Sequence, residues 1–308
     1  MEKTIITSGS GYIDIDAYAS CFAYGRLLKE KGIHVQIVST SQFNESICPL
    51  IQDLDFHFDN YQPDIKDQFI ILDVSNPAFM DTIVQKENII EIIDHHLGWE
   101  TTWQTKPSVN LHIEFIGSVC TLIYEKFKEE KMLDILDVNL CKLLIAGILD
   151  NTLNLKASIT TARDIQAYQE LLVIGHLTDD WGAAYFLSCQ SLIEKDLTSA
   201  LANDMKIEKT SSLLPKVFGQ LLVLKKDFIM DRLSEVYHFF KQYSKDWMLN
   251  VICLEDGKSY ILSDSPTVEK NLESLFPETQ FINHVLILEK FLLRKEIKKK
   301  AQEYTQKK

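Results

Sequence analysis

Four segments of the chain place acidic residues or histidines directly after apolar runs. The residues are Asp14 and Asp16 in GSGYIDID (9–16), Asp73 in FIILDVSNP (69–77), Asp94, His95 and His96 in EIIDHH (91–96), and Asp150 in AGILDNT (146–152). Carboxylate oxygen and imidazole nitrogen together suit Mn²⁺ or a similar ion. Three or four carboxylates with one or two histidines can hold two metal ions roughly 3.5–4 Å apart, a geometry that activates water and binds phosphoryl oxygens.

Each of these segments also has a purely structural interpretation. Asp14 and Asp16 are ordinary residues for a turn and a helix N-cap. The GSG sequence (9–11) is a weak signal for a phosphate loop, since Asp14 stands where a third glycine would fall. His95 and His96 alone are compatible with the end of a strand. Asp73 is harder to dismiss, because a carboxylate just beyond FIIL must be paired or metal-bound if it is buried. Together the segments favour a metal site.

The elements that would position these residues alternate between strands and helices. Strands are expected in KTIITSG (3–9), VQIVST (35–40), QFIILDVS (68–75) and NIIEIIDHH (88–96), and helices over 16–31, 117–129 and 138–149. The third and fourth strands are apolar almost to their last residues, which is typical of parallel sheets covered by helices. Ligands gather at the carboxyl ends of such strands.

The chain changes character near residues 188–195. Beyond that point the pattern predicts helices over 196–206 and 231–243 and strands in GQLLVLKK (219–226), WMLNVICL (247–254) and KSYILSD (258–264), before a basic end at 292–308. We therefore predict an α/β fold, with a doubly wound, mainly parallel sheet over residues 1–187 and a smaller α+β domain over residues 192–308. The active site is expected in the cleft between the two domains.

Composition limits the function classes. The 308 residues carry a net charge of −12, which argues against an extended nucleic-acid partner. No apolar run is long enough for a membrane span, and the N-terminal residues lack the pattern of a signal peptide. The six scattered cysteines form no CxxC pair and are expected as buried free thiols, so we expect a cytoplasmic protein. A homodimer is left open.

The ordered motifs resemble those of the DHH phosphoesterase superfamily. The motifs are GSGYIDIDA (9–17), ILDVSNP (71–77), IIDHH (92–96), GSVCT (117–121) and AGILDNTLNLKASITTARD (146–164). In the second half, NDMKIEK (203–209) and LLRKEIKK (292–299) resemble motifs of manganese-dependent family-II inorganic pyrophosphatases and prune-type exopolyphosphatases. There is no GGGH-like segment, which marks relatives that cleave oligonucleotides.

The resemblance implies a role for each site residue. Asp14 would bind one metal ion and Asp16 a second, Asp73 would bridge them, and His95 and Asp150 would complete the second site. Asp94 would orient the histidine pair, as metal-bound imidazoles usually require. His96 would face the substrate, and Lys206, Arg294 and Lys295 would bind its phosphate oxygens.

This chain departs from the family pattern at two positions. Ser10 stands where pyrophosphatases have a histidine, and a hydroxyl is a poor ligand for Mn²⁺. In AGILDNT, alignment from the following TLNLK places Asn151 rather than Asp150 at the metal position, and the sequence leaves both registers open.

These patterns predict a metal-dependent hydrolase that acts on the phosphoanhydride bond of a small substrate, pyrophosphate or short polyphosphate. One or two ions are expected, Mn²⁺ first and Mg²⁺ or Co²⁺ as alternatives. Two other functions stay open. One is a phosphodiesterase acting on short or cyclic nucleotides, and the other is a degenerate family member that binds metal or phosphate without catalysis.

Overall fold

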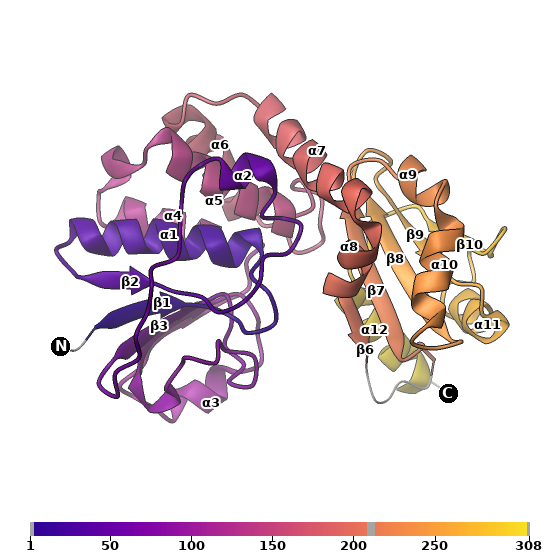
Figure 1. Ribbon diagram of the computed structural model, residues 1–308, viewed down its shortest axis with the longest axis horizontal. Coiled ribbons are helices and arrows are strands. Elements are labelled where there is room, and N and C mark those ends of the chain that lie inside the picture. The colour runs from indigo at the N-terminus through magenta and orange to yellow at the C-terminus, as the bar shows by residue number, and fades with distance from the viewer. Residues whose placement is uncertain (1–2, 208–212, 307–308) are drawn as a thin grey trace. The chain divides into compact units, whose positions relative to one another are not determined.

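The structure is a computed structural model that describes residues 3–207 and 213–306 (Figure 1). Glu208 and Lys209 of the NDMKIEK motif lie outside the described residues. The chain divides into two compact units, Met1–Tyr185 and Phe186–Lys308. The division falls within helix α7 (Asp180–Lys195), so the segment where the sequence changes character is helical.

The first unit is built on a five-stranded sheet in the order β2-β1-β3-β4-β5. Its strands are β1 (Thr4–Thr7), β2 (Val35–Ile37), β3 (Gln68–Leu72), β4 (Ile89–Asp94) and β5 (Asn110–Ile113). All neighbouring pairs run parallel. The order of the strands reverses at β1, which is flanked by β2 and β3. This is a topological switch point, where ligands bind in open parallel sheets.

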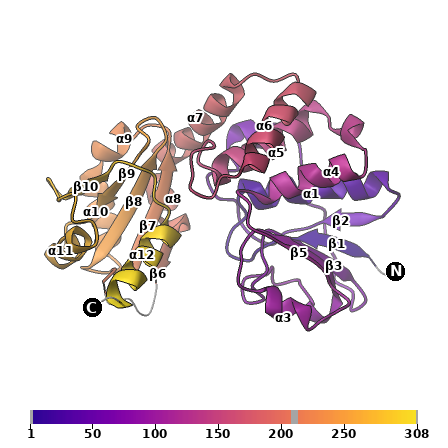
Figure 2. The same ribbon diagram turned by 180° about the vertical axis from the view of Figure 1, so that it is seen from behind.

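Helices cover both faces of this sheet. The helices of the first unit are α1 (Ile15–Glu30), α2 (Pro49–Gln52), α3 (Glu100–Gln104), α4 (Val119–Glu129), α5 (Val138–Asn151) and α6 (Ala162–Ile174), with short 3₁₀ turns η1 (Lys86–Asn88) and η2 (Leu133–Ile135). Helices α1, α4, α5 and α6 lie on one face and α3 lies on the other, as both views show (Figures 1 and 2). On the α3 face, Trp103 packs into a buried cluster with residues of β1, β3 and β4.

The second unit contains a mixed sheet in the order β10-β9-β8-β7-β6. Its elements are α8 (Leu197–Asn203), β6 (Met205–Ile207), β7 (Val217–Val223), α9 (Asp227–Met230), α10 (Leu233–Lys241), β8 (Trp247–Cys253), β9 (Lys258–Leu262), α11 (Pro266–Leu275), β10 (Val285–Leu288) and α12 (Arg294–Gln306). Trp247, Leu249 and Val251 of β8 pack against α8–α10, whereas Met248 packs against α11 and α12. The alternation of a strand therefore builds two cores, one on each face.

The predicted fold class is confirmed: a parallel α/β unit precedes an α+β unit. The prediction of one helix over 196–206 is wrong at its end, because α8 stops at Asn203 and the chain enters β6 at Met205. All six cysteines are buried free thiols, as expected. Within the described residues, no helix combines the length and the apolar character that crossing a membrane requires.

Candidate metal centre

The carboxyl ends of β1, β3 and β4 bring three of the predicted segments to one edge of the sheet. These strands are neighbours, and parallel strands end at the same edge. Asp73 follows β3 directly, and Asp94 is the last residue of β4. Asp14 and Asp16 lie at the start of α1, after β1. The fourth segment reaches this edge from a helix, because Asp150 and Asn151 are the last residues of α5.

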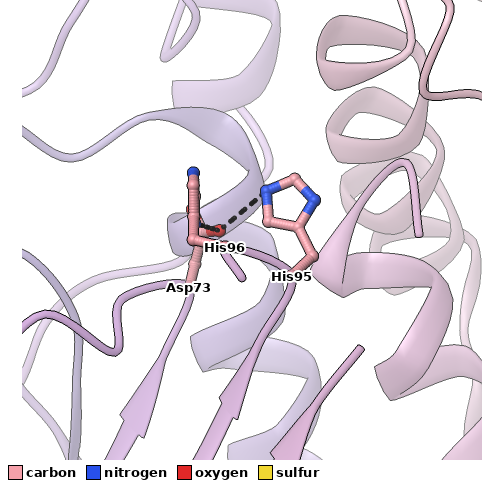
Figure 3. A group of neighbouring side chains, drawn as sticks. All are labelled: Asp73, His95 and His96. Carbon is pink, nitrogen blue, oxygen red and sulfur yellow. Dashed lines mark ion pairs between the residues drawn. The ribbon is translucent and has the colours of Figure 1, made fainter. Parts of the chain in front are cut away.

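Asp73, His95 and His96 form the tightest group at this edge. One ligand atom from each lies within 4.8 Å of the other two, close enough to hold one metal ion. Asp73 Oδ1 is 3.4 Å from His95 Nε2 and 3.7 Å from His96 Nδ1 (Figure 3). The side chains of Asp73 and His95 are 6% and 5% exposed, while that of His96 is 56% exposed. The group is therefore a buried pair with one histidine open to solvent.

The hydrogen bond of His95 determines which nitrogen faces Asp73. His95 Nδ1 lies 2.9 Å from the carbonyl oxygen of Ile116. A carbonyl oxygen only accepts hydrogen bonds, so Nδ1 carries the proton. Burial lowers the pKa of His95 below 6.5, and the neighbouring His96 lowers it further, so the ring is neutral near pH 7 and Nε2 presents a lone pair.

Two buried electron-pair donors thus face each other across 3.4 Å. A carboxylate oxygen and a neutral imidazole nitrogen in this position repel unless a cation lies between them. A borderline divalent ion such as Mn²⁺ accepts both kinds of ligand. The side chains of this group therefore fit a metal ion.

Asp94 orients the imidazole of His96 and accepts hydrogen bonds from the backbone of both histidines. It is fully buried, and its Oδ1 accepts hydrogen bonds from His95 N (2.7 Å), His96 N (3.1 Å) and His96 Nδ1 (2.8 Å). Burial alone would raise the pKa of Asp94, but the hydrogen bond and charge of His96 hold it below the usual range. The proton of His96 Nδ1 is thereby committed to Asp94, and Nε2 is the nitrogen left to meet a substrate.

Asp14 and Asp150 do not belong to this group of three and have other contacts. Asp14 caps α1 by accepting a hydrogen bond from Ala17 N (3.0 Å), and Asp150 Oδ1 accepts one from the Tyr185 hydroxyl (2.8 Å). Burial raises the pKa of Asp14 to about 6 and that of Asp150 to about 7, and the charge of Asp14 contributes to the second shift. A cation bound nearby would lower both pKa values.

Asp16 is placed differently from the other predicted ligands. It is 1% exposed and accepts hydrogen bonds from the start of α4: Ser118 Oγ (2.6 Å), Val119 N (2.9 Å) and Cys120 N (2.9 Å). The Nδ2 of Asn151 donates a further hydrogen bond to Asp16 Oδ2. Asn151, and not Asp150, is therefore the residue of α5 that meets Asp16.

One turn that joins these groups carries residues for which the sequence analysis gave no role. Ile116 accepts from His95, Gly117 N donates to Asp164 Oδ2 (3.0 Å), and Ser118 donates to Asp16. Asp164 is fully buried and also accepts from Thr121 Oγ1 (2.6 Å). The sequence does contain a signal for Asp164: a threonine followed three residues later by an acidic residue is the pattern of a capping box, and Thr161 and Asp164 form the capping box of α6.

The predicted phosphate-binding residues all lie in the second unit. Lys206 is on β6 and Lys295 on α12, and both side chains are exposed. Arg294 is only 11% exposed and forms a salt bridge with Asp204. Its Nη1 donates to the carbonyl oxygens of Asp204 (2.8 Å) and Phe218 (3.0 Å). Arg294 therefore has a structural role in this unit, and its predicted contact with phosphate stays a prediction.

The fold defines a parallel α/β domain with acidic and histidine side chains at its topological switch point. Residues 4–148 match the model of the DHH family, N-terminal domain. The family resemblance seen in the sequence is confirmed.

One curated relative matches nearly the whole chain and another matches about two thirds of it. A Streptococcus mutans protein named a probable manganese-dependent inorganic pyrophosphatase is 23% identical over 299 residues, 92% of this chain and 93% of the relative. An Oceanobacillus iheyensis protein with the same name is 25% identical over 209 residues, 67% of this chain and 66% of the relative.

Two solved structures share the fold. The chain is similar to a candidate family II inorganic pyrophosphatase from Methanococcus jannaschii, with a TM-score of 0.69, 17% identity and coverage of 97% of this chain and 99% of the other. It also resembles an exopolyphosphatase-related protein from Bacteroides fragilis, with a TM-score of 0.51, 14% identity and coverage of 99% and 92%.

We expect Asp73→Asn to abolish metal binding at this group while the fold is retained. Asp73 has a φ of 60°, a conformation that asparagine also adopts readily, so the backbone is not strained by the change. Mn²⁺ affinity, measured by calorimetric titration, should fall by more than roughly 10–100-fold. That is the loss typical of removing a residue that only hydrogen-bonds to a metal ligand. The free energy of unfolding in urea should not fall.

Asp55→Asn is the matched control, because Asp55 has a φ of 62° and its side chain is 89% exposed. Its Mn²⁺ affinity should equal that of the wild type. Unchanged affinity in Asp73→Asn would contradict the assignment of Asp73 as a ligand.

We expect Asp164 to act as a positioning residue for His95 through the turn at 116–118. Asp164→Ala leaves Gly117 N without its acceptor, whereas Asp164→Asn can keep an oxygen there and let the Thr121 hydroxyl accept instead. Asp164→Ala should weaken Mn²⁺ binding about tenfold, and Asp164→Asn should restore most of the loss. If Asp164→Ala melts at a lower temperature yet binds Mn²⁺ normally, its role is structural only.

Proposed function

We propose that this protein hydrolyses the phosphoanhydride bond of pyrophosphate or short polyphosphate with Mn²⁺ held at Asp73 and His95. The observation that carries the proposal is the buried pair of Asp73 Oδ1 and His95 Nε2, 3.4 Å apart, whose lone pairs face each other. Relatives named manganese-dependent inorganic pyrophosphatases support the choice of ion and substrate. The six buried free thiols support a cytoplasmic location.

Different residues of the chain would bind the ion, orient the histidines and contact the substrate. When bound, a divalent ion supplies Lewis acidity, which acidifies water and neutralises phosphoryl oxygens. Asp73 and His95 hold the ion, the carbonyl oxygen of Ile116 orients the imidazole of His95, and Asp94 orients that of His96. His96, exposed and held through Nδ1, presents Nε2 to the substrate and can exchange a proton with a phosphate oxygen. We propose that Lys206, Arg294 and Lys295 neutralise the remaining phosphate charge.

Hydrolysis in the presence and absence of Mn²⁺ tests this function, measured as inorganic phosphate released from the polyphosphates and as nucleotide products, separated by chromatography, from the nucleotides. The substrates are pyrophosphate, tripolyphosphate, a dinucleotide and a cyclic dinucleotide, with the wild type and Asp73→Asn assayed side by side. We expect Mn²⁺-dependent phosphate release from one or both of the first two substrates by the wild type alone. Cleavage of the nucleotides alone would favour a phosphodiesterase.

A non-catalytic family member is the second candidate, and a specific observation favours it. One predicted ligand is engaged elsewhere, because Asp16 is hydrogen-bonded by Asn151. At a second family position the histidine is replaced by Ser10, which donates to the carbonyl oxygen of Phe79 (3.2 Å). Mn²⁺ binding without hydrolysis of any of the four substrates would support this candidate.

We expect Lys295→Ala to weaken use of pyrophosphate about tenfold in kcat/KM without affecting Mn²⁺ affinity or the melting temperature. A charge-assisted contact with phosphate contributes about 1.5–3 kcal/mol, which corresponds to a loss of that size or larger. Lys295 is a cleaner test than Arg294, because it is exposed whereas Arg294 also stabilises the second unit through Asp204.

Lys299→Ala is the control for this variant, since Lys299 is an exposed lysine of the same helix. It should leave kcat/KM unchanged. Equal values for both variants and the wild type would mean that Lys295 does not contact the substrate.

A further inference from the structure

The carboxylate of Asp16 is already saturated by donors of the protein. An ionised carboxylate has about four good acceptor positions. Oδ1 of Asp16 accepts from Ser118 Oγ and Cys120 N, and Oδ2 accepts from Val119 N and Asn151 Nδ2. Three of the four donors belong to the first turn of α4, where a negative charge is also stabilised by the helix dipole.

Asn151 is the one donor of this set that comes from another element. It is the last residue of α5, and its neighbour Asp150 turns instead to the hydroxyl of Tyr185. Because a carboxylate only accepts hydrogen bonds, the nitrogen of the Asn151 amide is the end that must face Asp16. The amide group thus occupies the side of Asp16 that α4 leaves uncovered.

The closeness of α1, α4 and α5 keeps these residues in place. A Cβ on Gly147 of α5 would overlap Cys120 Sγ and lie 3.3 Å from the Cα of Asp16. Cys120 Sγ in turn lies 3.6 Å from the carbonyl oxygen of Asp16. Asp16 therefore has little freedom to turn away from α4 toward another ligand.

We infer that Asn151 withdraws Asp16 from the metal centre, so that the divalent ion at Asp73 and His95 is bound without the carboxylate of Asp16 that the family resemblance assigns to it. The amide group of Asn151 takes the place of a cation on Asp16, and Asp16 accepts hydrogen bonds from the start of α4 together with the N-cap residue Ser118. This inference rests on the metal centre of the proposed function, and it does not require that the protein be catalytic.

The inference is tested by the effect of Asp16→Asn on Mn²⁺ affinity in two backgrounds. In the wild type, Asp16 is not a ligand, so Asp16→Asn should change the affinity by less than about threefold. Asn151→Asp sets a carboxylate against Asp16 in a buried place, where two negative charges require a cation. It should raise Mn²⁺ affinity about tenfold or more, and adding Asp16→Asn to it should abolish the gain.

Two further readouts separate this effect from a general effect of charge. Asn154→Asp makes the same chemical change at an exposed position three residues later and should bind Mn²⁺ like the wild type. Metal-free Asn151→Asp should melt below the wild type, and saturating Mn²⁺ should raise its melting temperature more than that of the wild type.

The affinity for Mn²⁺ is measured by calorimetry without substrate, and elemental analysis checks that the ion is bound. An equal loss of affinity on Asp16→Asn in both backgrounds would overturn the inference. Absence of any bound ion would overturn both the metal centre and this inference. One bound ion in a protein that hydrolyses none of the substrates would contradict the proposed function alone.

Discussion

The structure of this site depends on a single hydrogen bond, from His95 Nδ1 to the carbonyl oxygen of Ile116. Because that bond takes the only ring proton of a neutral imidazole, the lone pair of Nε2 is directed at Asp73. A buried lone pair facing a buried carboxylate is unfavourable by itself and becomes favourable when a cation binds. We propose that the chain retains this unfavourable pair because it binds a metal ion.

The turn before α4 connects this hydrogen bond with the rest of the unit. Residues 116–120 accept from His95, donate to Asp164 and hold Asp16 at the start of the helix. A shift of this turn would therefore change the direction of His95 Nε2 and the environment of Asp16 together. Buried hydrogen-bonded networks of this kind are costly to disturb in part, because a single lost partner leaves a desolvated polar group.

The sequence predicted the sheet and the gathering of Asp73, Asp94, His95 and His96 because their positions follow from strand ends. A parallel strand that is apolar to its last residue leaves little choice about where the next polar residue lies.

The role of Asp16 could not be predicted in this way, because an aspartate near a helix start serves equally as a ligand and as a cap. Its hydrogen bonds come from α4 and α5, more than 100 residues away in the sequence. The salt bridge of Arg294 with Asp204 likewise depends on a contact across 90 residues. Sequence neighbours predict local structure, and only the packed chain decides which of two polar partners a side chain takes.

The most direct test of the proposed centre is a crystal structure of the protein grown with Mn²⁺, with the ion located by its anomalous scattering. A single strong peak within bonding distance of Asp73 Oδ1 and His95 Nε2 is expected, with Asn151 still hydrogen-bonded to Asp16. A peak bound to Asp16, or no peak beside Asp73 and His95, would contradict the proposed centre.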